Sequence, residues 1–268
     1  MIRRLQSLWK GSRPETAPEP GAGAGAVYAI GDIHGRADLL EPLLAEILRE
    51  STGRPATVVA LGDYVDRGPD SRAVVDLLLD LSADPHVGTR FLRGNHDQVL
   101  LDFLGDHGLG PYWRQVGGGE TLFSYGVEPP ATRKHMERWL EAQVRFADAL
   151  PRQHLDFFRA LEPSFTWGDY FFTHAGARPG APLGEQTEKD LMWIRQPFLE
   201  DEERFEKIVV HGHTPSGSPY ADHRRIGLDT GAYTTGILTA CRFDGSGRLL
   251  MQAVERPDGP IEIRRAAL

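Results

Sequence analysis

Five short segments of the sequence combine glycine with carboxylate, imidazole or amide side chains. They are GDIHG at 31–35, GDYVDRG at 62–68, RGNHD at 93–97, THAG at 173–176 and HGHT at 211–214. Each segment follows a short apolar run of the kind that is typical of a buried strand. Ligands bind at the carboxyl ends of strands in open α/β folds, so we expect the five segments to meet at one edge of a sheet.

The side chains of these segments suit a divalent metal ion. The candidate ligands are Asp32, His34, Asp63, Asn95, His174 and His213. Carboxylate, imidazole and amide oxygen together favour a first-row ion such as Mn²⁺, Fe²⁺ or Zn²⁺, and the thiolates of a structural zinc site are missing. A single Gly-Asp is more often a turn and a single histidine more often structural, a reading that fits His86, His107, His135, His154 and His223. The ordered set of five segments, in contrast, indicates a shared site.

The pattern around the first three segments predicts alternating strands and helices. Apolar runs at 27–30, 56–61 and 89–92 are predicted strands, and helical periodicity follows at 37–50, 71–81 and from 97 onward. This order implies parallel strands with right-handed crossovers. Later strand-like runs flank the turn DGSG at 244–247, which predicts a hairpin. We therefore predict an α/β protein with more than one sheet and a mostly helical insertion at about 105–165.

Composition limits the class of protein. The chain has 268 residues, of which 40% are apolar, and a net charge of −8, which argues against a general nucleic-acid binder. Cys241 is the only cysteine, so a disulfide framework is excluded and a reducing, cytoplasmic location is compatible. Residues 1–26 end in a Pro-, Gly- and Ala-rich stretch that predicts a flexible leader without stable membrane insertion. The folded domain is expected at 27–268, and its oligomeric state is left open.

The order of the five motifs resembles the phosphoprotein phosphatase branch of the calcineurin-like metallophosphoesterases. It is most similar to the compact bacterial and phage serine/threonine phosphatases, over about residues 27 to 243. The resemblance implies a sandwich of two mixed β-sheets flanked by helices. It also implies a metal-dependent phosphomonoesterase that hydrolyses phosphoserine and phosphothreonine in proteins, with phosphotyrosine as a further substrate.

The resemblance also assigns roles to the candidate ligands. Asp32 and His34 would bind a first metal, Asp63 would bridge both metals, and Asn95, His174 and His213 would complete the second site. Mn²⁺ is the first choice for both ions, with Fe or Zn as alternatives. A hydroxide that bridges the two metals would attack the phosphorus atom.

Four further residues receive catalytic or phosphate-binding roles from the resemblance. His96 would be the general acid for the leaving group, and Asp66 would orient its ring and raise its pKa. Arg67 and Arg195 would clamp phosphate oxygens with their guanidinium groups.

The neighbours of these residues receive less specific roles. Arg36 and Arg93 have weaker support as phosphate ligands than Arg67 and Arg195. Asp97 is expected to begin the helix that follows, where a carboxylate complements exposed N–H groups. His211 would lie near the ligands or be an ordinary strand residue.

Two other functions compete with the protein phosphatase. Symmetrical diadenosine tetraphosphatases share the metal ligands but typically have Ala-Arg where this chain has Asp66-Arg67, so Asp66 favours a protein phosphatase. The second rival is a binding module that has lost catalysis. Such a module should also have lost ligands, whereas all six candidates are present here.

Overall fold

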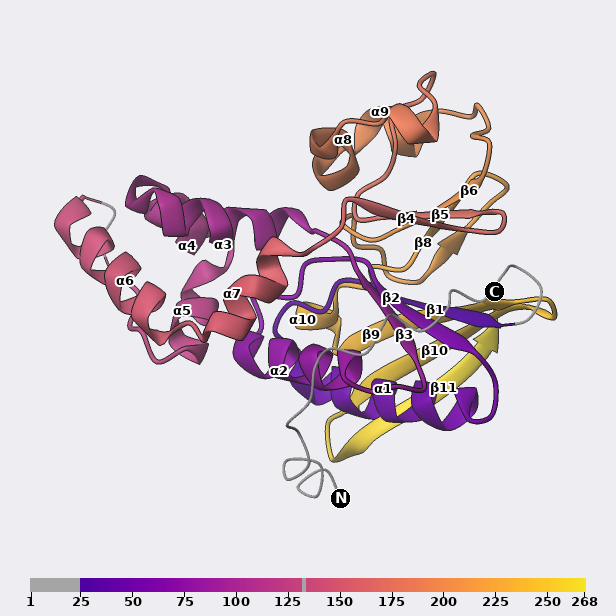
Figure 1. The fold of residues 1–268 in the computed structure, drawn as a ribbon, viewed down its shortest axis with the longest axis horizontal. Helices are drawn as coiled ribbons and strands as arrows, with labels where there is room; N and C mark the ends of the chain where they lie inside the picture. Colours follow the sequence, from indigo (N-terminus) through magenta and orange to yellow (C-terminus); the bar gives the residue numbers. More distant parts are fainter. Residues whose placement is uncertain (1–24, 132–133) are drawn as a thin grey trace.

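The computed structural model of the protein describes residues 25–131 and 134–268, and its strands form two mixed sheets (Figure 1). All but the last residues of the predicted leader, 1–26, lie outside the described part of the chain. The first sheet has the strand order β11-β10-β9-β1-β2-β3 and the second has the order β4-β5-β6-β8-β7. This arrangement, with helices on the outer faces, confirms the predicted α/β fold.

The first sheet joins a parallel half to an antiparallel half. Strands β1 (Ala26–Ile30), β2 (Ala56–Ala60) and β3 (Gly88–Phe91) are parallel, because α1 (Ala37–Ser51) and α2 (Ser71–Ser82) cross between them. Strands β9 (Ile237–Asp244), β10 (Gly247–Arg256) and β11 (Gly259–Ala267) form antiparallel hairpins, and β9 pairs with β1. The hairpin predicted around residues 244–247 is therefore present, whereas strand β11 was not predicted.

The second sheet is shorter and also mixed. Its parallel strands are β5 (Tyr170–Thr173), β6 (Ile208–His211) and β8 (Arg225–Gly227). Strands β4 (Ser164–Trp167) and β7 (Tyr220–Ala221) pair antiparallel at the two edges. The motifs THAG and HGHT follow β5 and β6, so they leave this sheet at the same edge.

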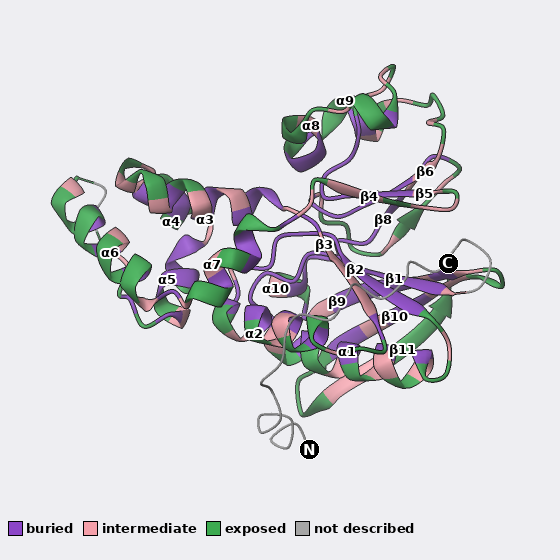
Figure 2. Cartoon of the chain, viewed as in Figure 1, coloured by how far each residue is buried: buried purple, intermediate pink, exposed green. Residues whose placement is uncertain are grey.

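Alternating side chains in β1 separate the two main apolar cores. Val27 and Ala29 face the second sheet and pack with Phe172 and Val210. Ala26, Tyr28 and Ile30 face the opposite side, towards the layer of helices α1 and α2. Strand β1 is buried on both faces (Figure 2), as its continuous apolar run predicts.

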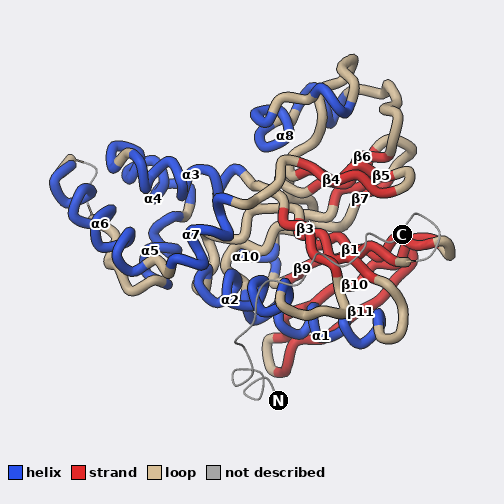
Figure 3. The backbone as a smooth tube through the Cα atoms, viewed as in Figure 1, coloured by secondary structure: helices blue, strands red, loops and turns tan. Residues whose placement is uncertain are grey.

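Helices between β3 and β4 form a lobe at one end of the molecule (Figure 3). They are α3 (Asn95–Gly105), α4 (Gly110–Val116), α5 (Gly118–Ser124), α6 (Met136–Ala149) and α7 (Arg152–Arg159), with a 3-10 turn at His107–Leu109. Three short helices follow later in the chain: α8 (Glu188–Trp193), α9 (Gln196–Glu200) and α10 (Ala232–Thr235), with a 3-10 turn at Leu183–Glu185. None of the helices in the described residues is long and apolar enough to cross a membrane.

Candidate dinuclear metal site

The five motif segments meet where the two sheets come together. The backbone N–H of His213 donates to both carboxylate oxygens of Asp32 at 3.1 Å, which joins the ends of β6 and β1. The Nε2 atom of His174 lies 3.0 Å from Oδ1 of Asn95, which joins the ends of β5 and β3. All six predicted ligands are buried, so the structure brings them to one interior site.

Asp63 lies at the centre of this site. Its Oδ2 atom is 3.4 Å from Nε2 of His34, and its Oδ1 atom is 3.4 Å from Nε2 of His174. Two groups of ligand atoms, each within 4.8 Å of one another, share this residue: His34, Asp63 and His96, and Asp63, His174 and His213. One carboxylate oxygen thus faces each group, as a ligand that bridges two metal ions requires.

The histidines are held in the form that binds metal. A carbonyl oxygen only accepts hydrogen bonds, so Nδ1 of His34 donates to Val65 at 2.8 Å and Nδ1 of His174 donates to Leu61 at 3.0 Å. Each ring therefore presents the lone pair of Nε2 to the site. Burial lowers the pKa of His34 to about 3 and that of His213 to about 2, so both are neutral imidazoles.

His213 brings to the site a buried nitrogen that has no hydrogen-bond partner among the described residues. Nε2 of His213 is shielded from solvent and makes no hydrogen bond. A buried polar atom without a partner is costly, and a metal ion bound at this nitrogen would remove the cost. The donor set around it is therefore a good fit for two divalent ions.

Crowded carboxylates also favour cations at this site. Burial, and then the negative charges of Asp229 and Asp63, raise the pKa of Asp32 well above its usual range. Burial also raises the pKa of Asp229 to about 6. For Asp63, burial is outweighed by the surrounding imidazoles, and its pKa is lowered. Divalent ions would offset the repulsion among these groups.

The sequence analysis missed Asp229. It follows β8 in the stretch Gly-Leu-Asp-Thr-Gly and is buried beside Asp32. A carboxylate just after an apolar strand is the pattern that identified the other segments. Asp229 was not identified by this pattern because no second metal-binding side chain lies next to it in the sequence.

The backbone is strained at the residues that form the site. Within the described residues, the non-glycine positions with positive φ are His34 (46°), Asp63 (53°), Asp66 (72°), Arg67 (70°) and His213 (64°). All belong to the predicted site. Left-handed conformations of this kind cost free energy and persist where the surrounding structure enforces them, which is common at functional sites.

His96 and Asp66 form a buried pair next to the metal ligands. Nδ1–H of His96 donates to Oδ2 of Asp66 at 2.7 Å, and its Nε2 lies 3.9 Å from Oδ2 of Asp63. Burial disfavours the protonated ring, but the charges of Asp63 and Asp66 outweigh it and raise the pKa of His96.

The helical lobe supports this pair. Trp113 of α4 donates its Nε1–H to both oxygens of Asp66 at 3.0 Å, and the Thr121 hydroxyl of α5 donates to Oδ1 at 2.6 Å. The backbone N–H of Asp66 in turn donates to the same hydroxyl at 2.9 Å. Sequence reasoning did not anticipate these contacts, because 47 and 55 residues separate the partners.

The predicted phosphate clamps differ in their surroundings. The guanidinium of Arg67 stacks on the ring of Tyr233, 4.7 Å from its centroid, and its Nη2 lies 3.0 Å from Nε2 of His96. Arg195 is exposed and donates to the carbonyl of His213 at 3.3 Å. Both arginines therefore border the metal site.

Arg36 and Arg93, by comparison, are held by partners elsewhere. Arg36 pairs with Asp38 and Glu255, and Arg93 donates to the carbonyl of Leu161 at 3.1 Å.

Asp97 does more than begin helix α3. Its Oδ2 accepts from the backbone N–H groups of Gly94 and Asp63, both at 2.9 Å, and its Oδ1 accepts from that of Tyr64 at 3.1 Å. The bond to Gly94 is the expected helix-capping contact. The other two tie the end of β3 to the strained turn after β2. His211, in contrast, is buried in β6 against Phe198.

Comparison with known proteins finds several bis(5'-nucleosyl)-tetraphosphatases among the relatives. The asymmetrical bis(5'-nucleosyl)-tetraphosphatase PrpE of Halalkalibacterium halodurans is 25% identical over 80% of this chain and 88% of its own. The same enzyme of Bacillus cereus strain AH820 is 26% identical over 80% and 89%. A symmetrical bis(5'-nucleosyl)-tetraphosphatase of Acidovorax sp. strain JS42 is 33% identical over 58% of this chain and 45% of its own.

Solved structures support the fold. A candidate diadenosine tetraphosphatase matches with a TM-score of 0.58 and 24% identity, covering 88% of this chain and 96% of its own. A cold-active protein tyrosine phosphatase of a Shewanella species matches with a TM-score of 0.58 and 15% identity, covering 93% and 83%. At these identities the likeness concerns the fold alone.

These relatives correct the expected function. The prediction of a serine/threonine protein phosphatase acting on phosphoproteins is wrong, because the relatives that match over most of the chain are named dinucleoside tetraphosphatases. The argument from Asp66 failed for a physical reason. This carboxylate is buried and bonded to His96 inside the protein, so its identity carries no information about the part of the substrate beyond the phosphate.

The family itself is shown by the sequence. The family model of the calcineurin-like phosphoesterases matches residues 25–236, which include all five motif segments. Members of this family are metallophosphoesterases with a centre of two divalent ions, in agreement with the two groups of ligands that share Asp63. The chain therefore belongs to the calcineurin-like phosphoesterase family.

Proposed function

We propose that this protein hydrolyses dinucleoside polyphosphates such as diadenosine tetraphosphate. The observation that carries the proposal is the similarity to bis(5'-nucleosyl)-tetraphosphatases over 80% of the chain, together with a buried site whose donors suit two divalent ions. The reaction breaks a phosphoanhydride bond and adds water across it. Two nucleotides result.

Six residues would hold the two ions in this proposal. Asp32 and His34 serve one ion, Asn95, His174 and His213 serve the other, and Asp63 serves both. The bound ions would supply Lewis acidity towards the phosphate oxygens and a more acidic water as nucleophile. Mn²⁺ is the proposed ion, and the same carboxylate, amide and imidazole donors also suit Fe²⁺ or Zn²⁺.

The remaining site residues would act on the substrate. Arg67 and Arg195 bind non-bridging phosphate oxygens through charge-assisted hydrogen bonds. His96 gives a proton to the oxygen of the leaving nucleotide, and Asp66 keeps its ring oriented for this transfer. In the described structure Nη2 of Arg67 lies 3.0 Å from Nε2 of His96, so the two side chains border the same space. A phosphoryl group bound there would have to replace this contact before His96 could donate from Nε2.

A direct comparison of substrates tests the proposal. The protein is incubated with Mn²⁺ and either diadenosine tetraphosphate or a phosphoserine peptide, and the products are separated by chromatography. We expect a kcat/KM for the tetraphosphate at least tenfold above that for the peptide. Two ADP would identify symmetrical cleavage, and ATP with AMP asymmetrical cleavage. Turnover of the peptide alone would overturn the proposal.

The His213→Ala variant tests the metal site in the same assay. It removes the imidazole whose Nε2 lacks a protein partner within the described residues, while its backbone N–H to Asp32 is kept. We expect loss of bound metal and of turnover together. The matched control, His223→Ala, changes a histidine outside the site and should keep both.

A further inference from the structure

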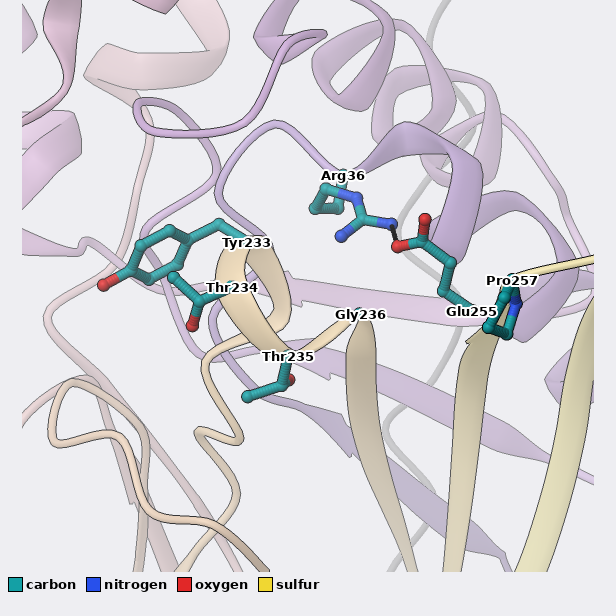
Figure 4. A pocket seen from close by; sticks show the side chains of 7 residues that line it. All are labelled: Arg36, Tyr233, Thr234, Thr235, Gly236, Glu255 and Pro257. Atoms are coloured by element: carbon teal, nitrogen blue, oxygen red, sulfur yellow. Dashed lines mark hydrogen bonds and ion pairs between the residues drawn. The ribbon is translucent and has the colours of Figure 1, made fainter.

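A cavity of about 240 Å³ lies beside the metal site and contains none of its proposed ligands (Figure 4). It is bounded by the short helix α10, by the beginning of α1 and by the end of β10. Its lining residues are Arg36, Tyr233, Thr234, Thr235, Gly236, Glu255 and Pro257.

Tyr233 connects the cavity to the reaction centre. Its ring makes an edge contact with His34, at 5.3 Å between centroids, and its face carries the guanidinium of Arg67 at 4.7 Å. The other lining residues extend from Tyr233 towards Glu255 and Pro257 at the far end of the cavity (Figure 4). A substrate with a phosphate at Arg67 and a further group beyond it could therefore place that group in the cavity.

Charges around the cavity disfavour another phosphate. Arg36 is the lining cation, and its guanidinium is bonded to Asp38 at 2.7 and 2.9 Å and to Glu255 at 2.7 Å. Its Nη1 donates to the carbonyl of Ala232 at 2.8 Å. The lining residues, with one arginine and one glutamate, carry no net charge, and the guanidinium of Arg36 is already bonded to two carboxylates and a carbonyl. The cavity therefore offers no free cation to a phosphate, whereas its carboxylate and hydroxyl oxygens can accept hydrogen bonds from uncharged hydroxyl groups.

Glu255 is the acceptor best placed for such hydroxyl groups. Its backbone N–H donates to the carbonyl of Gly236 at 2.8 Å, which fixes it to the end of α10. Its Oε2 accepts from Arg36, and the side chain is 55% exposed, so the carboxylate is oriented by the protein and open to the cavity. Carboxylates bind the hydroxyl groups of ribose in other nucleotide sites.

We infer that this cavity binds the ribose of the nucleoside next to the hydrolysed phosphates, and that Glu255 accepts a hydrogen bond from its 2′- or 3′-hydroxyl group. The inference rests on the proposed function and adds a residue that determines specificity. The phosphate chain would pass from Arg67 across Tyr233, and the uncharged sugar would follow into the cavity beside Glu255.

The test compares diadenosine tetraphosphate with its analogue that has 2′,3′-dideoxyribose at both ends. A hydrogen bond to a charged group corresponds to a preference of about tenfold or more in kcat/KM. We expect the unmodified protein to prefer the ribose substrate by this factor, and Glu255→Ala to reduce the preference to about twofold or less. In this variant Arg36 keeps its hydrogen bonds to the side chain of Asp38 and to the carbonyl of Ala232, so its position is maintained.

Glu262→Ala is the matched control. Glu262 is also a glutamate paired with arginines, on the neighbouring strand β11, but it does not line the cavity. This control should keep the full preference for ribose. An equal preference in the unmodified protein and in Glu255→Ala would overturn the inference while leaving the proposed function intact. Failure of the unmodified protein to hydrolyse either tetraphosphate would overturn both.

Discussion

Replacing Asp97 by asparagine should lower the free energy of unfolding, although Asp97 is not a proposed metal ligand. Its two oxygens accept three backbone N–H groups, from Gly94 and Asp63 on Oδ2 and from Tyr64 on Oδ1. Asparagine has a single acceptor oxygen. If that oxygen keeps Gly94 and Asp63, the amide NH₂ group faces the N–H of Tyr64, and two donors oppose each other in a fully buried place.

The size of the effect follows from this count. One hydrogen bond is lost and one buried N–H is left without an acceptor, which costs about 1–3 kcal/mol. Burial, and then the charge of Asp63, raise the pKa of Asp97 to about 8, while its three N–H partners favour ionisation. The number of hydrogen bonds that Asp97 accepts does not depend on its protonation state, because a protonated carboxyl group can still accept on both oxygens. We therefore expect a loss of about 2 kcal/mol in the free energy of unfolding.

Urea unfolding in the presence of a chelator measures this loss, because bound metal would otherwise stabilise the folded state. Asp102→Asn is the matched control, since Asp102 lies on the exposed side of the same helix α3 and is bonded by the Gln98 side chain. The control should change the unfolding free energy by about 0.5 kcal/mol or less. If Asp97→Asn and the control have the same free energy of unfolding, the three hydrogen bonds to Asp97 do not stabilise the turn after β2.

Three further substitutions test the assignment of roles at the site. His96→Asn should lower kcat by about 10²–10⁴-fold, the range for general acid catalysis, and keep the metal content; equal loss of metal in this variant would refute the acid role. Asp63→Asn should lose metal and turnover together, and metal analysis that finds both ions retained would contradict a bridging ligand. Thr121→Val removes the hydroxyl bonded to Asp66 without changing shape. It should cost about 2 kcal/mol of unfolding free energy and lower kcat, with KM unchanged, whereas unaltered stability and kcat would show that Asp66 needs no such support.

The local pattern was sufficient to predict most of the elements that carry the site. The runs before Gly31, Gly62 and Arg93 are the strands β1, β2 and β3, and helical periodicity located α1, α2 and α3. Strand β11 was missed because its sequence, GPIEIRRAA, begins with Gly-Pro and has largely exposed side chains, so no buried face appears in the pattern.

Substrate choice could not be predicted from one motif residue. Asp66 interacts with His96, Trp113 and Thr121, all within the protein, so its identity carries no information about the group attached to the phosphate. The similarity over most of the chain, rather than this residue, identified relatives named tetraphosphatases.

By itself, the sequence determined the order of strands, helices and motif segments, and hence which side chains leave the sheets at the same edge. Strand periodicity and glycine turns are local properties, so they can be recognised in a short stretch of chain. Only the tertiary structure decided which partners control those side chains: Asp229 beside Asp32, and Tyr233 between Arg67 and the cavity. These partners are separated by well over a hundred residues, and their contacts arise from how the two sheets and the helical lobe pack.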